Sequence, residues 1–173
     1  DEMGRMVAAQ VGALQGIAAL AGAEVRYVKP HGALGNLAAA DPAVARAIVA
    51  AVAALPGRLA VLAISGTDLE LAARATGAEV YSEIFADRGY LPNGRLVPRS
   101  QPGAMLHDPS EAAERLVRFL EDGRMPVVGG DPIPLAAQSI CVHGDSPGAV
   151  AMAKEIRTRL SAAGIGVEPF LKP

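Results

Sequence analysis

The chain alternates between short apolar runs and amphipathic helical patterns along its whole length. Helical spacing of apolar residues predicts a first helix over residues 2–21, and further helices are expected after Asp41-Pro42, Gly66-Thr67, Asp108-Pro109 and Ser146-Pro147. Strands are expected at about 24–29, 59–64, 79–85, 125–129, 138–142 and 166–170. This alternation predicts βα units and a parallel α/β sheet. About six strands are too few for an eight-stranded barrel, so the pattern fits either an open doubly wound sheet or a barrel without its first units.

The three histidines each end an apolar run and are followed by turn residues. His31 precedes Gly32, His107 precedes Asp108-Pro109, and His143 precedes Gly144-Asp145. Ligands bind at the carboxyl ends of strands in parallel α/β folds, because the loops converge there on a rigid sheet. The shared position therefore predicts a functional site.

Composition narrows the class of protein. The 173 residues are 51% hydrophobic, which is enough for one sizeable core, and the formal net charge of −2 offers no broad basic field for nucleic acid. Aromatic residues make up only 3%, so a stacking platform for single strands is not expected. The single Cys141 excludes an internal disulfide and is expected to pack inside a strand. No signal peptide or membrane span is visible, and a cytoplasmic location is expected.

Two strand ends combine an imidazole with a charged neighbour. In Lys29-Pro30-His31-Gly32 a cation and an imidazole stand beside a glycine that allows a ligand to approach closely. His143 and Asp145 lie two residues apart, which suits a general base with an orienting acid or two ligands of a divalent ion. The candidate catalytic residues in these two segments are His31, His143 and Asp145.

Further charged residues lie at the end of the predicted strand near Phe85 and just beyond it. Glu83, Asp87 and Arg88 belong to this group, and Arg99 lies in the long segment between residues 88 and 107 that is expected to act as a lid or clamp. Arginine suits a carboxylate or phosphate because it can bind either one bidentately. Dinucleotide and P-loop glycine motifs are absent from the sequence.

Four strings together resemble the LamB/YcsF lactam-utilisation family, which includes the A subunit of bacterial 5-oxoprolinase. They are residues 27–34 (YVKPHGAL), 83–90 (EIFADRGY), 97–108 and 141–147 (CVHGDSP), in the family's order. The resemblance implies a (β/α) barrel of the deacetylase-like type. Members of the family begin with further βα units that have no counterpart here, so residues 1–173 are expected to form a single but incomplete barrel domain.

The same resemblance implies ATP-dependent opening of 5-oxoproline to L-glutamate, with 5-oxoprolinase subunits B and C as partners. In that scheme His31 and His143 are candidate acid and base, and Asp145 orients. Substrate or phosphate binding falls to Lys29, Glu83, Asp87, Arg88 and Arg99. Two alternatives remain open: a metal-dependent amidohydrolase or deacetylase acting alone, with His31, His143 and Asp145 as ligands, and a non-catalytic subunit that docks a partner enzyme.

Overall fold

A computed structural model describes residues 2–144 and 147–171. The chain forms two compact units, Asp1–Ser82 (unit 1) and Glu83–Pro173 (unit 2), and the boundary falls inside the strand β3 (Val80–Phe85). That residues 1–173 make a single domain stays a prediction.

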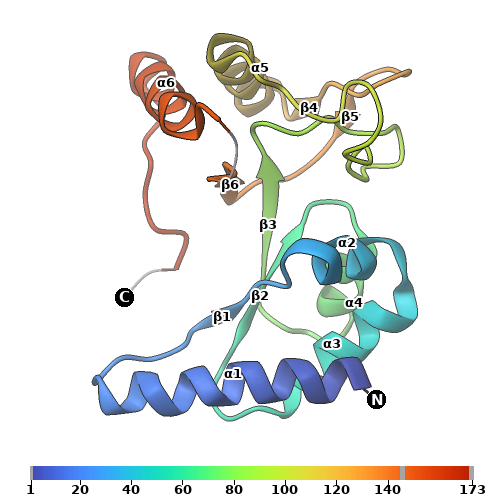
Figure 1. The fold of residues 1–173 in the computed structure, drawn as a ribbon, viewed down its shortest axis with the longest axis vertical. Coiled ribbons are helices and arrows are strands. Elements are labelled where there is room, and N and C mark those ends of the chain that lie inside the picture. The colour runs from blue at the N-terminus through green and yellow to red at the C-terminus, as the bar shows by residue number, and fades with distance from the viewer. Residues whose placement is uncertain (1, 145–146, 172–173) are drawn as a thin grey trace. The chain divides into compact units, whose positions relative to one another are not determined.

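Unit 1 packs four helices around a parallel pair of strands (Figure 1). Its elements are α1 (Glu2–Leu20), β1 (Tyr27–Val28), α2 (Gly32–Ala40), α3 (Pro42–Ala54), β2 (Ala60–Ile64) and α4 (Asp68–Ala75), followed by the first half of β3. The register pairs Tyr27 with Ala60 and Val28 with Val61. A core of aliphatic side chains from β2 and the helices, including Ile48 and Val61, lies between these layers.

The α2–α3 region shows which helix starts the sequence predicts. Asp41 caps α3 as expected, because its carboxylate accepts hydrogen bonds from the Ala43 and Val44 amides and Pro42 follows at the first turn. The preceding helix α2 was not predicted. Its N-cap is His31, whose side chain makes no capping hydrogen bond, so α2 has no polar start signal.

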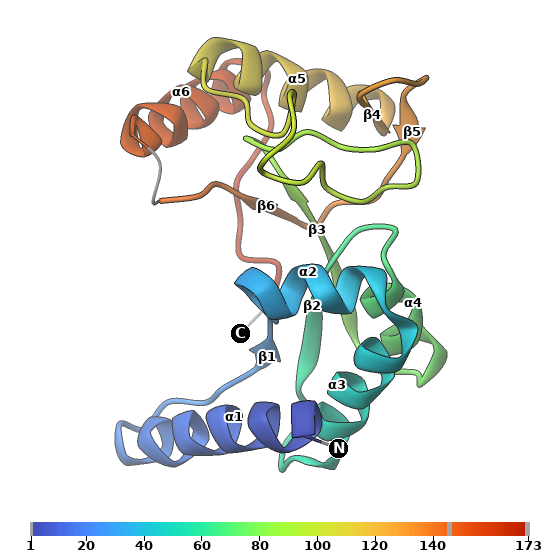
Figure 2. The same cartoon turned by 45° about the vertical axis from the view of Figure 1, so that its right-hand side comes forward.

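Unit 2 places two adjacent helices, α5 and α6, on a second parallel pair of strands (Figure 2). Its elements are the second half of β3, α5 (Pro109–Asp122), β4 (Arg124–Met125), β5 (Ile133–Pro134), β6 (Ser139–Cys141) and α6 (Ala149–Ala162). β3 and β6 run parallel, with Phe85 opposite Cys141, whereas β4 and β5 form a short antiparallel pair. Ile84, Tyr90, Leu116 and Met125 are fully buried in this unit's own core.

Several predicted strands are shorter than expected or do not form. β4 covers only two residues, one of them in the predicted 125–129 run, and residues 166–170 form no strand although they follow α6 as expected. The run before His107 is also not a strand, because only Met105 forms an isolated bridge there, with Arg88. His107 is therefore an exposed loop residue rather than a strand-end residue.

The fold class is α/β with parallel strand pairs, as predicted. In unit 1 the strand order is β1-β2-β3, and in unit 2 β3 is followed by β6. Across residues 2–144 and 147–171 these pairings do not close into a barrel, in agreement with the expected incomplete barrel. No single helix in those ranges is both long and apolar enough to span a membrane, although α2 and α3, which meet at a 116° bend, reach that length and apolarity together.

A buried carboxylate in unit 1 predicts how stability depends on pH. Burial alone would raise the pKa of Glu70, but hydrogen bonds from Ser82, Arg74 and the Gly66 amide outweigh it and hold the pKa below its usual 4.5. This contribution to stability is therefore fully present above about pH 4.5 and is lost as the pH falls through the lowered pKa.

We expect Glu70→Gln to lower the free energy of unfolding by about 1–2 kcal/mol near pH 7 and by clearly less near pH 3. Urea denaturation at both pH values checks this. Glu114→Gln is the matched control, because Glu114 pairs with Arg118 on an exposed helix face. A difference between Glu70→Gln and the native chain that is equally large at both pH values would contradict the assignment.

Candidate functional site

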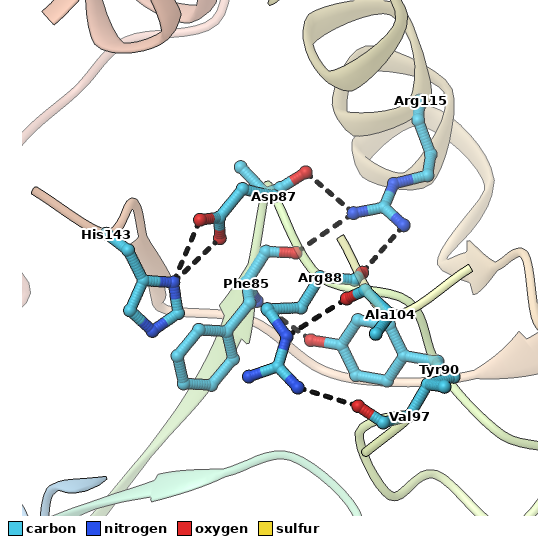
Figure 3. A network of polar contacts seen from close by, with 9 residues as sticks. Phe85, Asp87, Arg88, Tyr90, Val97, Ala104, Arg115 and His143 are labelled. Atoms are coloured by element: carbon cyan, nitrogen blue, oxygen red, sulfur yellow. Dashed lines mark hydrogen bonds and ion pairs between the residues drawn. The ribbon is translucent and has the colours of Figure 1, made fainter. Parts of the chain in front are cut away.

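An imidazole–carboxylate pair lies at the carboxyl end of the parallel strands of unit 2. His143 Nδ1 is 2.9 Å from Asp87 Oδ2 and 3.0 Å from Oδ1 (Figure 3). The register explains the contact: Phe85 lies opposite Cys141, and Asp87 and His143 each stand two residues beyond that pair. The Asp87 and His143 side chains are only 5% and 11% exposed, respectively, so water screens the contact little.

The ring of Phe85 fixes the plane of the imidazole. Phe85 and His143 stack with their ring centroids 5.2 Å apart and an interplanar angle of 16°. An ionised carboxylate only accepts hydrogen bonds, so Nδ1 carries the proton that it donates to Asp87. In a neutral imidazole that donates from Nδ1, Nε2 is the unprotonated nitrogen, and Figure 3 shows Nε2 pointing away from Asp87. This arrangement suits a general base.

Arg88 has a different environment from the one the sequence predicted. Its side chain is buried, and it donates from Nε to the Ala104 carbonyl at 3.0 Å and from Nη2 to the Val97 carbonyl at 2.7 Å (Figure 3). These carbonyls stand at the two ends of the exposed loop 98–103. Arg88 therefore holds the base of that loop, while its predicted role in binding substrate or phosphate stays a prediction.

The loop that Arg88 holds carries the exposed Arg99. Burial, followed by the nearby positive charge of Arg99, lowers the pKa of Arg88. Two guanidinium groups thus stand near one another in unit 2, on the same stretch of chain as Asp87. Two adjacent positive charges favour an anion beside them, and the predicted carboxylate or phosphate contact of Arg99 stays a prediction.

Comparison with known proteins places the chain in a family. The LamB/YcsF family model matches residues 1–173. The chain belongs to the LamB/YcsF family.

Similar proteins are longer than this chain. It is 46% identical over 170 residues to an A subunit of 5-oxoprolinase from Pseudomonas syringae pv. tomato, covering 98% of this chain and 66% of that protein. It is 50% identical over 161 residues to the A subunit of 5-oxoprolinase from Kocuria rhizophila, covering 93% and 64%. A crystal structure of a lactam utilization protein from Thermus thermophilus superposes with a TM-score of 0.86 at 38% identity, covering 96% of this chain and 66% of that one. The chain spans about two thirds of the length of these relatives.

The remaining predicted residues of this LamB/YcsF chain fall into three groups. Glu83 is buried in unit 2 and accepts a hydrogen bond from the Ser139 hydroxyl at 3.1 Å, across the β3–β6 pair. Lys29 and His31 follow β1 in unit 1, where His31 is exposed and Gly32 takes the left-handed φ of +59° that starts α2. Asp145 lies outside the described residues.

The structure brings Asp87, for which the sequence predicts a binding role, into contact with His143. The predicted orienting role of Asp145, which lies outside the described residues, stays a prediction. Among residues 2–144 and 147–171, no three His, Cys, Asp or Glu side chains lie close enough to hold a metal ion. The described part of the chain thus pairs one imidazole with one carboxylate.

Sequence reasoning missed two side chains that support this site. Tyr90 is fully buried, and its hydroxyl accepts a hydrogen bond from the Phe85 amide at 2.8 Å, at the end of β3. Arg115 extends from α5 to the residues after β3 (Figure 3). A signal existed for Arg115, because it stands three residues after Ala112 and four before Phe119, on the apolar stripe of α5.

Close backbone packing beneath loop 98–103 predicts a large effect for one glycine. A Cβ at Gly89 would lie 1.9 Å from the Gly103 carbonyl oxygen, so the two segments must separate. We expect Gly89→Ala to lower the free energy of unfolding by about 1–3 kcal/mol or more, measured by thermal unfolding. Gly166→Ala is the control, because a Cβ there meets no atom within 4 Å. Equal thermal unfolding midpoints for Gly89→Ala and Gly166→Ala would contradict the close packing of Gly89 against Gly103.

Proposed function

We propose that this LamB/YcsF chain takes part in ATP-dependent opening of 5-oxoproline to L-glutamate, and that His143 is the general base. The observation that carries the proposal is the His143–Asp87 pair, which leaves Nε2 as a proton acceptor at a strand end. The relatives are named as A subunits of 5-oxoprolinase, and that name supplies the substrate class.

The chemistry of a lactam explains why ATP and a base are both needed. An unstrained five-membered lactam is a stable amide with a poor leaving group. Transfer of the ATP γ-phosphoryl group to the lactam oxygen forms an O–P bond, breaks the β–γ phosphoanhydride bond with ADP as the leaving group, and makes the ring carbon electrophilic. Water then attacks that carbon, and an adjacent base lowers the barrier by removing the water proton as the C–O bond forms.

In the proposed step, His143 Nε2 takes the proton from the attacking water while Asp87 stabilises the resulting imidazolium. The tetrahedral intermediate collapses when the ring C–N bond breaks and the nitrogen receives a proton, with His31 as the candidate acid. This collapse leaves an acyl phosphate on the γ-carbon of glutamate. Its hydrolysis by a second water releases inorganic phosphate and the γ-carboxylate.

The binding roles follow the charge of the substrates. Lys29, Arg88 and Arg99 are proposed to hold the phosphate groups or the 5-oxoproline carboxylate, with Glu83 nearby as a polar contact. ATP is the co-substrate, 5-oxoprolinase subunits B and C are the partners, and the cytoplasm is the location we propose. Because the relatives are each named as one subunit of 5-oxoprolinase, their names support an assembly of several chains.

Co-expression with candidate B and C subunits tests the proposal. We expect glutamate release from 5-oxoproline that requires ATP and all three chains. Release without ATP, together with a bound transition metal in the purified protein, would instead support the metal-dependent amidohydrolase. Full activity of the assembly after substitution of both His31 and His143 would support a docking role for this chain. Either result would overturn the proposal.

A further inference from the structure

Arg115 binds the backbone at the carboxyl end of β3 rather than a carboxylate. Its Nη1 donates to the Arg88 carbonyl at 2.8 Å, and its Nη2 donates to the Ala86 carbonyl at 2.6 Å and the Phe85 carbonyl at 3.2 Å (Figure 3). In the described part of the chain no acidic side chain forms an ion pair with Arg115, although Asp87 and Glu111 are near enough to influence it. One guanidinium thus binds three carbonyls of the four-residue segment 85–88.

Partial burial of this guanidinium is unfavourable because it removes water from the charge. Burial lowers the pKa of Arg115, whereas the Tyr90, Asp87 and Glu111 side chains act in the opposite direction. A half-buried charge that is hydrogen-bonded to carbonyls adds little to stability compared with an apolar residue of the same size. The position of Arg115 is better explained by the backbone that it holds, because the three carbonyls flank Asp87.

The three carbonyls flank Asp87 on both sides. The Asp87 carbonyl itself accepts from the Leu106 amide at 2.9 Å, and the Ala86 amide donates to the Cys141 carbonyl at 3.0 Å. Every carbonyl from Phe85 to Arg88 is therefore bonded, and three of the four bond to Arg115. Fixed peptide planes on each side fix the direction of the Asp87 Cα–Cβ bond, and with it the carboxylate that meets His143 Nδ1.

We propose that Arg115 is a positioning residue that acts through the 85–88 backbone to hold Asp87 against His143. The effect of this positioning on catalysis rests on the proposed function, in which His143 is the base. Lysine cannot replace it, because a single ammonium group cannot bind three carbonyls in the planar arrangement of a guanidinium. Direct binding of an anionic substrate by Arg115 is the competing role.

The first test measures the imidazole itself and needs no activity. Heteronuclear NMR of the chain with labelled histidine reports which His143 nitrogen carries the proton. We expect the Nδ1–H tautomer in the native chain and a mixture with a substantial Nε2–H population in Arg115→Lys and Arg115→Gln. Arg118→Lys is the control, because Arg118 lies on the exposed face of α5 and pairs with Glu114. An unchanged tautomer in Arg115→Lys, with an unchanged thermal midpoint, would overturn the inference.

The second test separates this inference from the proposed function. In the assembled enzyme we expect Arg115→Lys to lower kcat by about 10- to 100-fold with little change in KM. A raised KM with unchanged kcat would show that Arg115 contacts substrate, and would overturn the positioning role. A shifted tautomer with unchanged turnover would support positioning and refute His143 as the base. An unshifted tautomer, with turnover still lost in His143→Ala, would refute positioning alone.

Discussion

Replacing His143 with alanine in the assembled enzyme should lower turnover by about 10²- to 10⁴-fold, which is the usual range for loss of a general base. The reason is local, because Nε2 of a neutral imidazole is the unprotonated nitrogen when Nδ1 donates to Asp87. Steady-state glutamate release at saturating ATP measures the effect on kcat.

Asp87→Asn provides the sharpest comparison for this result. Its amide nitrogen can donate to Nδ1 and thereby favour the Nε2–H tautomer, in which Nε2 no longer accepts a proton. We expect a loss approaching that of His143→Ala, and a double variant no worse than either single one, because the two residues act as one unit. His107→Ala is the control histidine. Near-native turnover of His143→Ala in a folded assembly would remove His143 from the mechanism.

The sequence predicts the two helix starts that are capped by aspartate, α3 and α5, but it does not predict the start of α2. Asp41 and Asp108 each accept hydrogen bonds from two amides of the first turn, which is the interaction that makes aspartate a local signal. The start of α2 at Gly32 carries no such side chain, and the helix was missed. The run 166–170 has strand-like residues, but a strand also requires a neighbour to bond with, and none pairs with it among the described residues.

In the candidate site, the contact between residues that are distant in sequence was also not predicted. Sequence position predicted that His143 would be functional, because strand ends are recognisable locally. Asp145, two residues further along the chain, is predicted as the orienting acid, and this stays a prediction because it lies outside the described residues. Asp87 is 56 residues away from His143, and only the β3–β6 register, with Phe85 opposite Cys141, brings it into contact. Pairing between strands that are distant in sequence is the information that composition and periodicity do not contain.

His31 is expected to serve the same reaction as His143, although the two belong to different units of the chain. It follows β1 as His143 follows β6, and its exposed side chain makes no capping bond to α2, so the fold of unit 1 leaves it available for chemistry.

A double-mutant cycle tests whether His31 and His143 act on the same reaction. We expect His31→Ala alone to lower turnover by about 10²- to 10⁴-fold without changing the thermal midpoint, because the side chain is exposed. Acid and base groups that act on one substrate are not additive, so the double variant with His143→Ala should lose far less than the product of the two single losses. His107→Ala combined with His143→Ala provides the baseline for two independent positions. A multiplicative loss for the His31 and His143 pair, or an unfolded His31→Ala, would mean that His31 belongs to a separate site or to the fold of unit 1.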